Sequence, residues 1–237
     1  MIIHLIHLKN VSIFDQLLLE EKLLREDSRN FCILNEGSSP AIVMGISGKP
    51  EELIHYSKAQ ELQIPLIQRF SGGGTVVIDK DTLFVTFLCN KEEFSFPAYP
   101  ERIMKWTETF YHQALELPNF ALKENDFVLG DFKCGGNAQY IKKERWLQHT
   151  SFLWDFCPKK MESLLLPRKK PKYREERSHL DFLCTLNNHF SSKEIFFQNI
   201  KTTLSKEHTV IPINYCDIQE MPGTRIQTKI LELSPNP

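Results

Sequence analysis

The spacing of hydrophobic residues divides the chain into short strands and a few helices. Residues 1–8 are mostly apolar and predict a first strand. Ser12, with Asp15 three positions later, resembles a capping box and predicts the start of a helix. The apolar runs FCILNEG and AIVMGIS lie on either side of a turn and predict a strand-turn-strand unit. We expect a second helix near residues 51–62.

The middle of the chain predicts glycine-broken strands around one clear helix. The segment IPLIQRFSGGGTVVIDKDTLFVTFLCN predicts three strands, joined by a glycine turn and a polar turn, in the order of a β-meander. Residues 100–117 carry apolar side chains at every third or fourth position, which predicts a helix that Pro118 ends. The stretch FVLGDFKCGGNAQYIKKERWLQHTSFLWDF predicts a second antiparallel meander.

The last part of the chain predicts one more helix and an irregular tail. Ser191 and Glu194 are expected to cap the helix, and the tail from about residue 210 is either docked or frayed. Strands and helices without a regular βαβ rhythm predict an α+β fold, with a mixed, largely antiparallel sheet and helices packed on one side of it. At 237 residues, we expect a single domain over residues 1–237.

Composition and charge exclude several classes of function. Hydrophobic content of 41% and charged content of 25% are those of a globular protein, and a net charge of -1 does not favour nucleic acid as a partner. The six cysteines form no CxxC pair, so we expect reduced thiols rather than a zinc site or a disulfide framework. Without a signal-peptide pattern or a run of about 18 apolar residues, we expect a cytoplasmic monomer that binds no membrane.

The first candidate site is the glycine turn. Gly72, Gly73 and Gly74 follow Arg69 and Ser71 between two predicted strands. Bare backbone exposes N–H groups to a phosphate or acyl group, and a guanidinium supplies paired hydrogen bonds to an anion. The Walker GK[ST] ending and the Rossmann strand-to-helix context are both absent from this segment. From these residues alone, an anion site and a flexible hairpin are equally good interpretations.

The second candidate site surrounds a lysine. Asn125 and Asp126 precede the run GDFKCGGNAQ, which contains Lys133, and His149 and Ser151 follow in WLQHTSF. A lysine on an edge strand is usually a surface cation. A lysine next to backbone that can approach a ligand closely also stabilises charge on a transferring phosphoryl or acyl oxygen.

These motifs resemble those of the lipoate-protein ligase A family, within the biotin/lipoate A/B protein ligase superfamily. RFSGGGTVVID followed by TLFVTF resembles the family motif RRxxGGGxVxHD, and NDFVLGDFKCGGNAQ with HTS resembles RNDL, GRKxSGxA and HGT. Their order and spacing agree over roughly residues 35–155. The segments MKWTETFY and YREERSHLDFLC resemble plant-like members, so that the resemblance covers most of the chain.

The resemblance implies the biotin/lipoyl protein ligase catalytic-domain fold and a lipoate-protein ligase activity. It makes Lys133 the essential lysine, which contacts the acyl carbonyl and the α-phosphate of an acyl adenylate. The residues expected to bind substrate or nucleotide are Arg69, Ser71, Gly72, Gly73, Gly74, Asn125, Asp126, Gly136, Asn137, Ala138, His149 and Ser151.

The resemblance also implies substrates and partners. We expect ATP with Mg²⁺, lipoate as the substrate, and no metal site in the protein itself. The implied acceptors are the lipoyl domains of 2-oxoacid dehydrogenase complexes and glycine cleavage H protein. Bacterial ligases of this family have a small C-terminal domain that this chain is not expected to contain, so an accessory protein is a further implied partner.

Five positions depart from the family motifs. Gln68 replaces the first arginine, and Ile78 stands where a histidine is expected. Asp81 and Thr82 replace the usual Gly-Asn, and Thr150 replaces the glycine of HGT. These changes bear on the contacts to the nucleotide and the acyl group.

Two alternatives to the ligase remain open at this level. A lipoyl or octanoyl transferase would take its acyl group from an acyl carrier protein, a lipoylated protein or preformed lipoyl-AMP. Octanoyltransferases of this fold use a cysteine thiolate, for which Cys134 and Cys157 are the candidates. Cys134 would face away from Lys133 in a regular strand, which favours a packing role, whereas Cys157 precedes a proline in a predicted loop. The second alternative is a binding module without catalysis.

A basic run is a candidate docking segment. PRKKPKYREER at residues 167–177 contains six basic residues, including Arg168, Lys169, Lys170 and Lys172. Such a run is able to steer an acidic lipoyl domain or acyl carrier protein toward a site, although it is more often a solvated loop that flanks the core.

Overall fold

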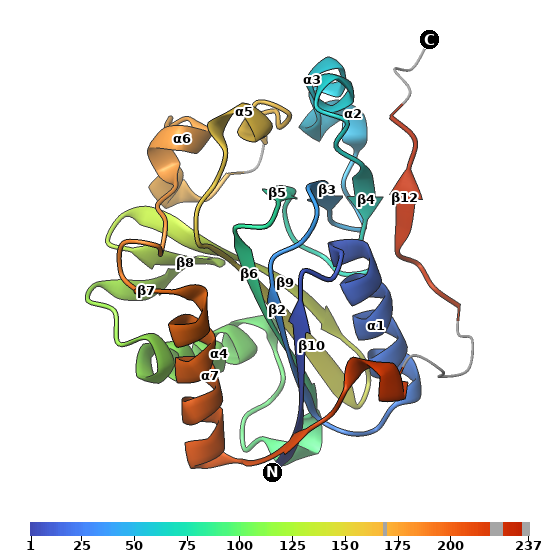
Figure 1. Ribbon diagram of the computed structural model, residues 1–237, viewed down its shortest axis with the longest axis vertical. Helices are drawn as coiled ribbons and strands as arrows, with labels where there is room; N and C mark the ends of the chain where they lie inside the picture. Colours follow the sequence, from blue (N-terminus) through green and yellow to red (C-terminus); the bar gives the residue numbers. More distant parts are fainter. Residues whose placement is uncertain (168–169, 219–224, 234–237) are drawn as a thin grey trace.

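The computed structural model describes residues 1–167, 170–218 and 225–233, and two β-sheets form its centre (Figure 1). The large sheet contains, in spatial order, β11 (Thr209–Pro212), β1 (Ile2–Lys9), β2 (Phe31–Glu36), β6 (Thr82–Asn90), β10 (Arg145–Leu153), β9 (Phe132–Ile141), β8 (Asp126–Leu129) and β7 (Phe120–Lys123). The small sheet contains β12 (Lys229–Leu231), β4 (Leu66–Gln68), β3 (Ala41–Met44) and β5 (Val76–Ile78).

Strand pairing is parallel in a few places and antiparallel elsewhere. In the large sheet, β1 runs parallel to both β11 and β2, and the remaining pairs are antiparallel. In the small sheet, β3 is parallel to β4 and antiparallel to β5, while β12 is antiparallel to β4. This architecture confirms the predicted α+β fold class with a mixed, largely antiparallel sheet.

Helices cover both faces of the large sheet, not one face as predicted. They are α1 (Ile13–Glu26), α2 (Pro50–Leu53), α3 (Tyr56–Glu61), α4 (Pro100–Leu115), α5 (Pro158–Met161), α6 (His179–Phe182) and α7 (Lys193–Glu207), with 3-10 turns at Lys91–Glu93, Lys172–Arg174 and Tyr215–Ile218. Helices α4 and α7 pack together on one face, and α1 packs on the other face with the small sheet (Figure 1). In the described residues, no helix has the length and apolar character needed to cross a membrane.

Strand alternation explains this two-sided packing. In β6, Val85 and Phe87 point into the core shared with α4 and α7, whereas Phe84 and Leu88 point into the clusters that contain α1. Every residue from Thr82 to Cys89 is buried. Because β6 is covered on both faces, its sequence is a nearly continuous apolar run.

Most predicted elements are confirmed, but several of their partners and ends differ. Strands β2 and β3 do not pair, because they belong to different sheets. Strands β4, β5 and β6 do not form the predicted meander, since β4 and β5 flank β3 and β6 lies in the large sheet. The helix expected at 51–62 is two helices, α2 and α3, separated at Ile54, which forms a β-bridge with Leu164. The meander of β8, β9 and β10 is confirmed, and Ser192 rather than Ser191 caps α7.

A buried carboxylate holds the C-terminal segment against α1. Glu21 is fully buried and pairs with Arg25 at 2.6 Å. It accepts hydrogen bonds from the backbone N–H of Gln227 at 2.9 Å and from the N–H and hydroxyl of Thr228 at 3.0 and 2.9 Å. These contacts precede β12 and fix its approach to β4. The described part of the tail is therefore a docked extension.

Replacing Glu21 with glutamine should weaken this attachment. Glu21→Gln keeps the side-chain size but removes the charge, and we expect the free energy of unfolding to fall by about 2 kcal/mol because hydrogen bonds to a charged group contribute about 1.5–3 kcal/mol. Urea unfolding measures this change, and amide exchange at residues 227–231 should become faster. Glu26→Gln, at an exposed position on the same helix, is the control. Equal unfolding midpoints for the two variants would contradict the role of Glu21.

Candidate functional site

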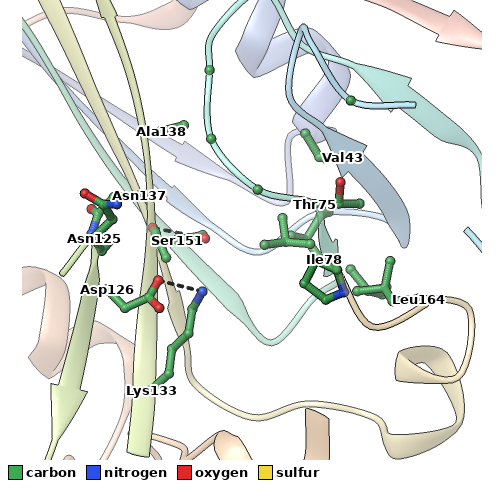
Figure 2. A pocket seen from close by; sticks show the side chains of 18 of the residues that line it. Val43, Thr75, Ile78, Asn125, Asp126, Lys133, Asn137, Ala138, Ser151 and Leu164 are labelled. Carbon is green, nitrogen blue, oxygen red and sulfur yellow. Dashed lines mark hydrogen bonds and ion pairs between the residues drawn. The ribbon is translucent and has the colours of Figure 1, made fainter. Parts of the chain in front are cut away.

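A large cleft lies between the two sheets. Its volume is about 1410 Å³, above the roughly 300–1,000 Å³ of an ordinary small-molecule pocket. Strands β8, β9 and β10 contribute one wall, and β3, β5 and the glycine turn contribute the other (Figure 2). Apolar side chains of α1, β3, β5 and β6 line part of it, among them Leu17, Val43, Ile78 and Phe84. The cleft therefore offers both an apolar lining and polar groups.

The structure brings almost all of the predicted site residues to this cleft. Ser71 is the exception, because it is buried and its carbonyl accepts a hydrogen bond from the Ile46 N–H at 3.0 Å. The predicted residues that line the cleft are Arg69, Gly72, Gly73, Gly74, Asn125, Asp126, Lys133, Gly136, Asn137, Ala138, His149 and Ser151.

The glycine turn joins β4 to β5 and rests directly on β9. Gly73 has a φ of +111°, and a Cβ there would lie 2.6 Å from Arg69 Nη2 and 2.9 Å from the carbonyl oxygen of Asn137. The Gly72 N–H also donates to the carbonyl of Gln139 at 3.3 Å. Only glycine has both the backbone freedom and the lack of a side chain that this contact requires.

Arg69 holds the shape of the glycine turn. Its Nη2 donates to the carbonyls of Gly72 and Gly74 at 2.9 and 2.8 Å, and its Nε donates to Gly72 at 3.3 Å. Burial lowers the pKa of the guanidinium to about 10. The sequence suggested that this group pairs with an anion, but its donors are directed mainly at backbone carbonyls, which need partners in a turn without side chains.

Lys133 extends into the cleft from a β-bulge in β9. The register of β8 and β9 shifts here, so that Cys134 has no residue opposite it. Lys133 Nζ lies 2.7 Å from Asp126 Oδ1, as the dashed line in Figure 2 shows. A Cβ on Gly136 would lie 3.4 Å from Nζ. The ammonium group thus stands beside bare backbone, with one carboxylate as its partner.

Two residues that the sequence did not assign to the site complete this charged group. The Tyr173 hydroxyl donates to Asp126 Oδ2 at 2.9 Å. Arg174 is 4% exposed and borders the cleft, its Nη2 has no hydrogen-bond partner among the described residues, and burial lowers its pKa. Its guanidinium carbon lies 4.8 Å from the centre of the Phe182 ring. Both Tyr173 and Arg174 belong to the basic run at residues 167–177, which was interpreted from its sequence as a docking segment or a solvated loop. Its sequence has no periodic pattern that would show which side chains point into the protein.

The rest of that basic run is only partly described. Lys170 pairs with Glu176 at 2.7 Å, and Arg177 packs over the rings of Phe132 and Phe182. Arg168 and Lys169 lie outside the described residues. At least two of the six basic residues, Arg174 and Arg177, therefore have internal contacts in place of a freely solvated position.

A buried network orients His149 at the cleft wall. His149 Nδ1 lies 2.9 Å from Glu20 Oε1 and 3.0 Å from Thr86 Oγ1. Glu20 is fully buried and also accepts a hydrogen bond from Gln16 Nε2 at 2.8 Å. Sequence reasoning missed Glu20, although a glutamate on the apolar face of a predicted helix is the signal of a buried partner.

The positions that depart from the family motifs have distinct environments. Ile78 lines the cleft, whereas the Gln68 Nε2 donates to the carbonyl of Ile46 at 3.0 Å. The buried Thr150 hydroxyl donates to Asn137 Oδ1 at 2.7 Å. Asp81 and Thr82 take part in a turn, where the Asp81 N–H donates to a side-chain oxygen of the preceding Asp79 at 2.9 Å.

The candidate acyl-carrier cysteines do not border the cleft. Cys134 is buried in the core, where burial raises the pKa of its thiol. Its Sγ–H donates to the carbonyl of Phe127 at 3.4 Å. Cys157 precedes α5 and borders a separate small hollow. In the part of the chain that the structure describes, no cysteine lines the cleft.

Curated relatives of this chain carry the names of lipoate-protein ligases. The chain is 28% identical to a Plasmodium falciparum protein named inactive lipoate–protein ligase 2, over 92% of this chain and 72% of the relative. It is 29% identical to lipoate-protein ligase LplJ of Bacillus subtilis, over 56% of this chain. The match spans 39% of the length of the Bacillus protein and 43% of the length of a Saccharomyces cerevisiae protein named putative lipoate-protein ligase A.

Solved structures share the fold at low sequence identity. A bi-partite lipoate protein ligase from Thermoplasma acidophilum, described with its E2 lipoyl domain, has a TM-score of 0.76 and 16% identity, over 93% of this chain and 89% of that one. A lipoate-protein ligase A bound with ATP has a TM-score of 0.73 and 15% identity, over 92% and 90%. Plasmodium falciparum LipL1 in complex with lipoate has a TM-score of 0.71 and 18% identity, over 91% and 67%.

The match to a protein family covers most of the chain. The family model described as the lipoyl protein ligase A/B catalytic domain matches residues 12–209. This range includes both walls of the cleft, the glycine turn and Lys133. The chain belongs to the lipoyl protein ligase A/B catalytic-domain family.

Proposed function

We propose that this chain is a lipoate-protein ligase that forms lipoyl-AMP from lipoate and ATP and transfers the lipoyl group to a lysine of a lipoyl domain. The observation that carries the proposal is the position of Lys133, whose ammonium faces a cleft of about 1410 Å³ beside the bare backbone of Gly136. This volume is sufficient for a nucleotide and an acyl chain together. The ligase relatives and the ATP-bound and lipoate-bound structures of the same fold support the choice of substrates.

In the first proposed step, a carboxylate oxygen of lipoate attacks the α-phosphorus of ATP and pyrophosphate leaves. Lys133 exchanges its contact with Asp126 for oxygens of the phosphoryl and acyl groups, and so stabilises the charge that develops there. The backbone of the glycine turn lies across the cleft and positions the nucleotide. The apolar lining from Leu17 to Phe84 accommodates the acyl chain.

In the second step, the acceptor lysine attacks the acyl carbonyl as a neutral amine. The new amide bond forms as the bond to AMP breaks, AMP takes the electron pair, and the amine proton passes to solvent. Lys133 stabilises the carbonyl oxygen and the departing phosphate. The protein needs no nucleophile of its own, which agrees with the absence of cysteine from the described lining of the cleft.

The cleft fits a magnesium ion that arrives with the nucleotide. The described residues contain no cluster of three or more His, Cys, Asp or Glu side chains able to hold a metal. Asp126 is the carboxylate beside Lys133 and is able to contribute one ligand. Mg²⁺ in nucleotide sites is usually bound by phosphates and one or two carboxylates. Bound there, the ion would neutralise phosphate charge.

A second function is supported by a specific observation. The Plasmodium relative is named inactive although it matches 92% of this chain. This name supports the alternatives in which the chain does not carry out the whole ligase reaction: it then either transfers the lipoyl group from preformed lipoyl-AMP that a partner protein supplies, or binds without catalysis. Transfer from an acyl carrier protein has less support, because an acyl-cysteine intermediate needs a thiol in the cleft.

Replacing Lys133 should abolish modification of an acceptor. We expect Lys133→Gln to lower the rate of lipoylation of a purified apo lipoyl domain by at least about 100-fold, because a neutral side chain does not stabilise the developing charge. Mass spectrometry of the acceptor measures the reaction with lipoate and Mg-ATP. Lys143→Gln, whose side chain is 93% exposed, is the control. A fully active Lys133→Gln variant would exclude the proposed role.

Varying the donor distinguishes the two functions. With wild-type protein, we expect lipoylation from lipoate and Mg-ATP and also from synthetic lipoyl-AMP, since both steps use Lys133. Lipoylation from lipoyl-AMP alone would identify the transferase. Lipoylation or octanoylation from an acyl carrier protein, without ATP, would contradict both the ligase and the transferase that uses lipoyl-AMP.

Removing the Tyr173 hydroxyl should impair the reaction without abolishing it. We expect Tyr173→Phe to lower kcat/KM about tenfold, because a hydrogen bond to a carboxylate contributes about 1.5 kcal/mol and Asp126 loses one of its two partners. Tyr99→Phe, at an exposed tyrosine, is the control. Unchanged kinetics in Tyr173→Phe would show that the hydroxyl does not position Asp126.

A further inference from the structure

Cys134 and Cys184 occupy matching positions on two segments that meet beside Lys133. A parallel β-bridge joins Lys133 to Leu183, and the Cys184 N–H donates to the carbonyl of Lys133 at 2.9 Å. The next residue on each segment is a cysteine. In a parallel pair, residues at matching positions project to the same face. Cys184 accordingly packs against the core cluster that contains Cys134.

This arrangement is compatible with a disulfide. Neighbouring strands lie about 4.8 Å apart, and a disulfide needs Cα atoms separated by about 4.4–6.8 Å. Each thiol donates to a backbone carbonyl of an adjacent strand, Cys134 Sγ to Phe127 in β8 and Cys184 Sγ to Phe132 in β9, both at 3.4 Å. Both cysteines are free in the structure.

The two thiols differ in exposure and in acidity, as the two members of a redox-active cysteine pair commonly do. Cys184 is half-buried, whereas Cys134 is 0% exposed. The neighbouring Cys134 side chain lowers the pKa of Cys184 below its ordinary value, against the effect of burial. Burial raises the pKa of Cys134. Cys184 is thus the more accessible and more acidic thiol, and Cys134 is a protected neighbour within reach.

We propose that Cys134 and Cys184 form a reversible redox site, in which a hydroperoxide oxidises them to a disulfide that joins β9 to segment 178–184. The Cys184 thiolate attacks the O–O bond of hydrogen peroxide, which gives a sulfenic acid and releases hydroxide. The Cys134 sulfur then attacks the Cys184 sulfur, and water leaves. Overall, two thiols lose two hydrogens and two electrons, and the peroxide becomes two molecules of water. A dithiol reductant reverses the change by exchange.

The other described cysteines lack this combination. Cys32 and Cys89 are both 0% exposed, and burial raises the pKa of each thiol. Cys216 is exposed, in the 3-10 turn at Tyr215–Ile218, and Cys157 lies before α5. Peroxide therefore reaches Cys184, which has a second cysteine beside it, and also Cys157 and Cys216, of which the exposed Cys216 serves as an internal reference.

The disulfide would affect the cleft through segment 178–184, whose last residue is Cys184. His179, Phe182 and Leu183 of this segment line the cleft, and Leu183 is bridged to Lys133. A covalent link at Cys134 would hold them against β9 and restrict the movement that admits an acyl adenylate or an acceptor lysine. This consequence rests on the proposed function, whereas formation of the disulfide does not.

Mass spectrometry tests the chemistry without any assay of activity. The full chain is treated with hydrogen peroxide, alkylated and digested under non-reducing conditions. We expect a linked Cys134–Cys184 peptide pair that is two hydrogens lighter than its components and disappears after treatment with dithiothreitol. Cys184→Ser should abolish the pair and leave Cys134 reduced, while Cys216→Ser should leave the pair unchanged. Alkylation of Cys184 in full after peroxide treatment, or its oxidation to sulfinic acid without the link, would overturn the proposal.

Lipoyl transfer by the same samples tests the consequence for the cleft. We expect oxidised wild type to transfer the lipoyl group on the order of tenfold more slowly than reduced protein, with recovery after dithiothreitol and no effect of peroxide on Cys184→Ser. A linked protein that keeps full activity would overturn the effect on the cleft. A chain that forms the link but transfers nothing in either state would contradict the proposed function and still support the redox site.

Discussion

The contact between the glycine turn and β9 is the constraint on which the cleft depends. A side chain at Gly73 would collide with both Arg69 and the backbone of Asn137, so the two sheets approach this closely only because the turn is bare. The guanidinium of Arg69 then fastens the turn through the carbonyls of Gly72 and Gly74. The two sheets meet at this contact, and the cleft that lies between them is lined by both apolar and polar side chains.

Charged side chains gather on the side of the cleft that β8 and β9 form. A β-bulge in β9 sets the orientation of Lys133 there. Because Cys134 is the extra residue in β9, Lys133 and Gly136 share a face even though an odd number of positions separates them, and the cysteine enters the core instead. Asp126 pairs with the ammonium group from β8, the Tyr173 hydroxyl donates to the second oxygen of Asp126, and Arg174 borders the same cleft. A cation held by one carboxylate is ready to exchange that partner for a phosphate or carbonyl oxygen, which is the chemistry that the family uses.

Local patterns predicted the elements well and their partners poorly. The helix caps at Ser12, the strand runs and the glycine turn follow from neighbouring residues, so the sequence shows them directly. Which strand pairs with β4 or β5 depends on β3, which lies far from them in sequence, and no periodicity in the GGG segment reveals it. The motif residues converge as predicted, apart from Ser71, but Arg69 faces backbone, and Tyr173, Arg174 and Glu20 join the site through tertiary contacts that a linear motif does not contain.

The pairing of the first strand has a consequence for how the chain folds during synthesis. Strand β1 leaves the ribosome first, yet one of its two parallel neighbours, β11, is translated after all the other strands of its sheet. The small sheet is likewise completed by β12, after its three other strands have been made. Non-local pairings of this kind form slowly and leave backbone edges open in the meantime. A nascent chain that stalls before these strands emerge would expose both edges, which makes the speed of translation through β11 and β12, and protection by chaperones, relevant to the yield of folded protein.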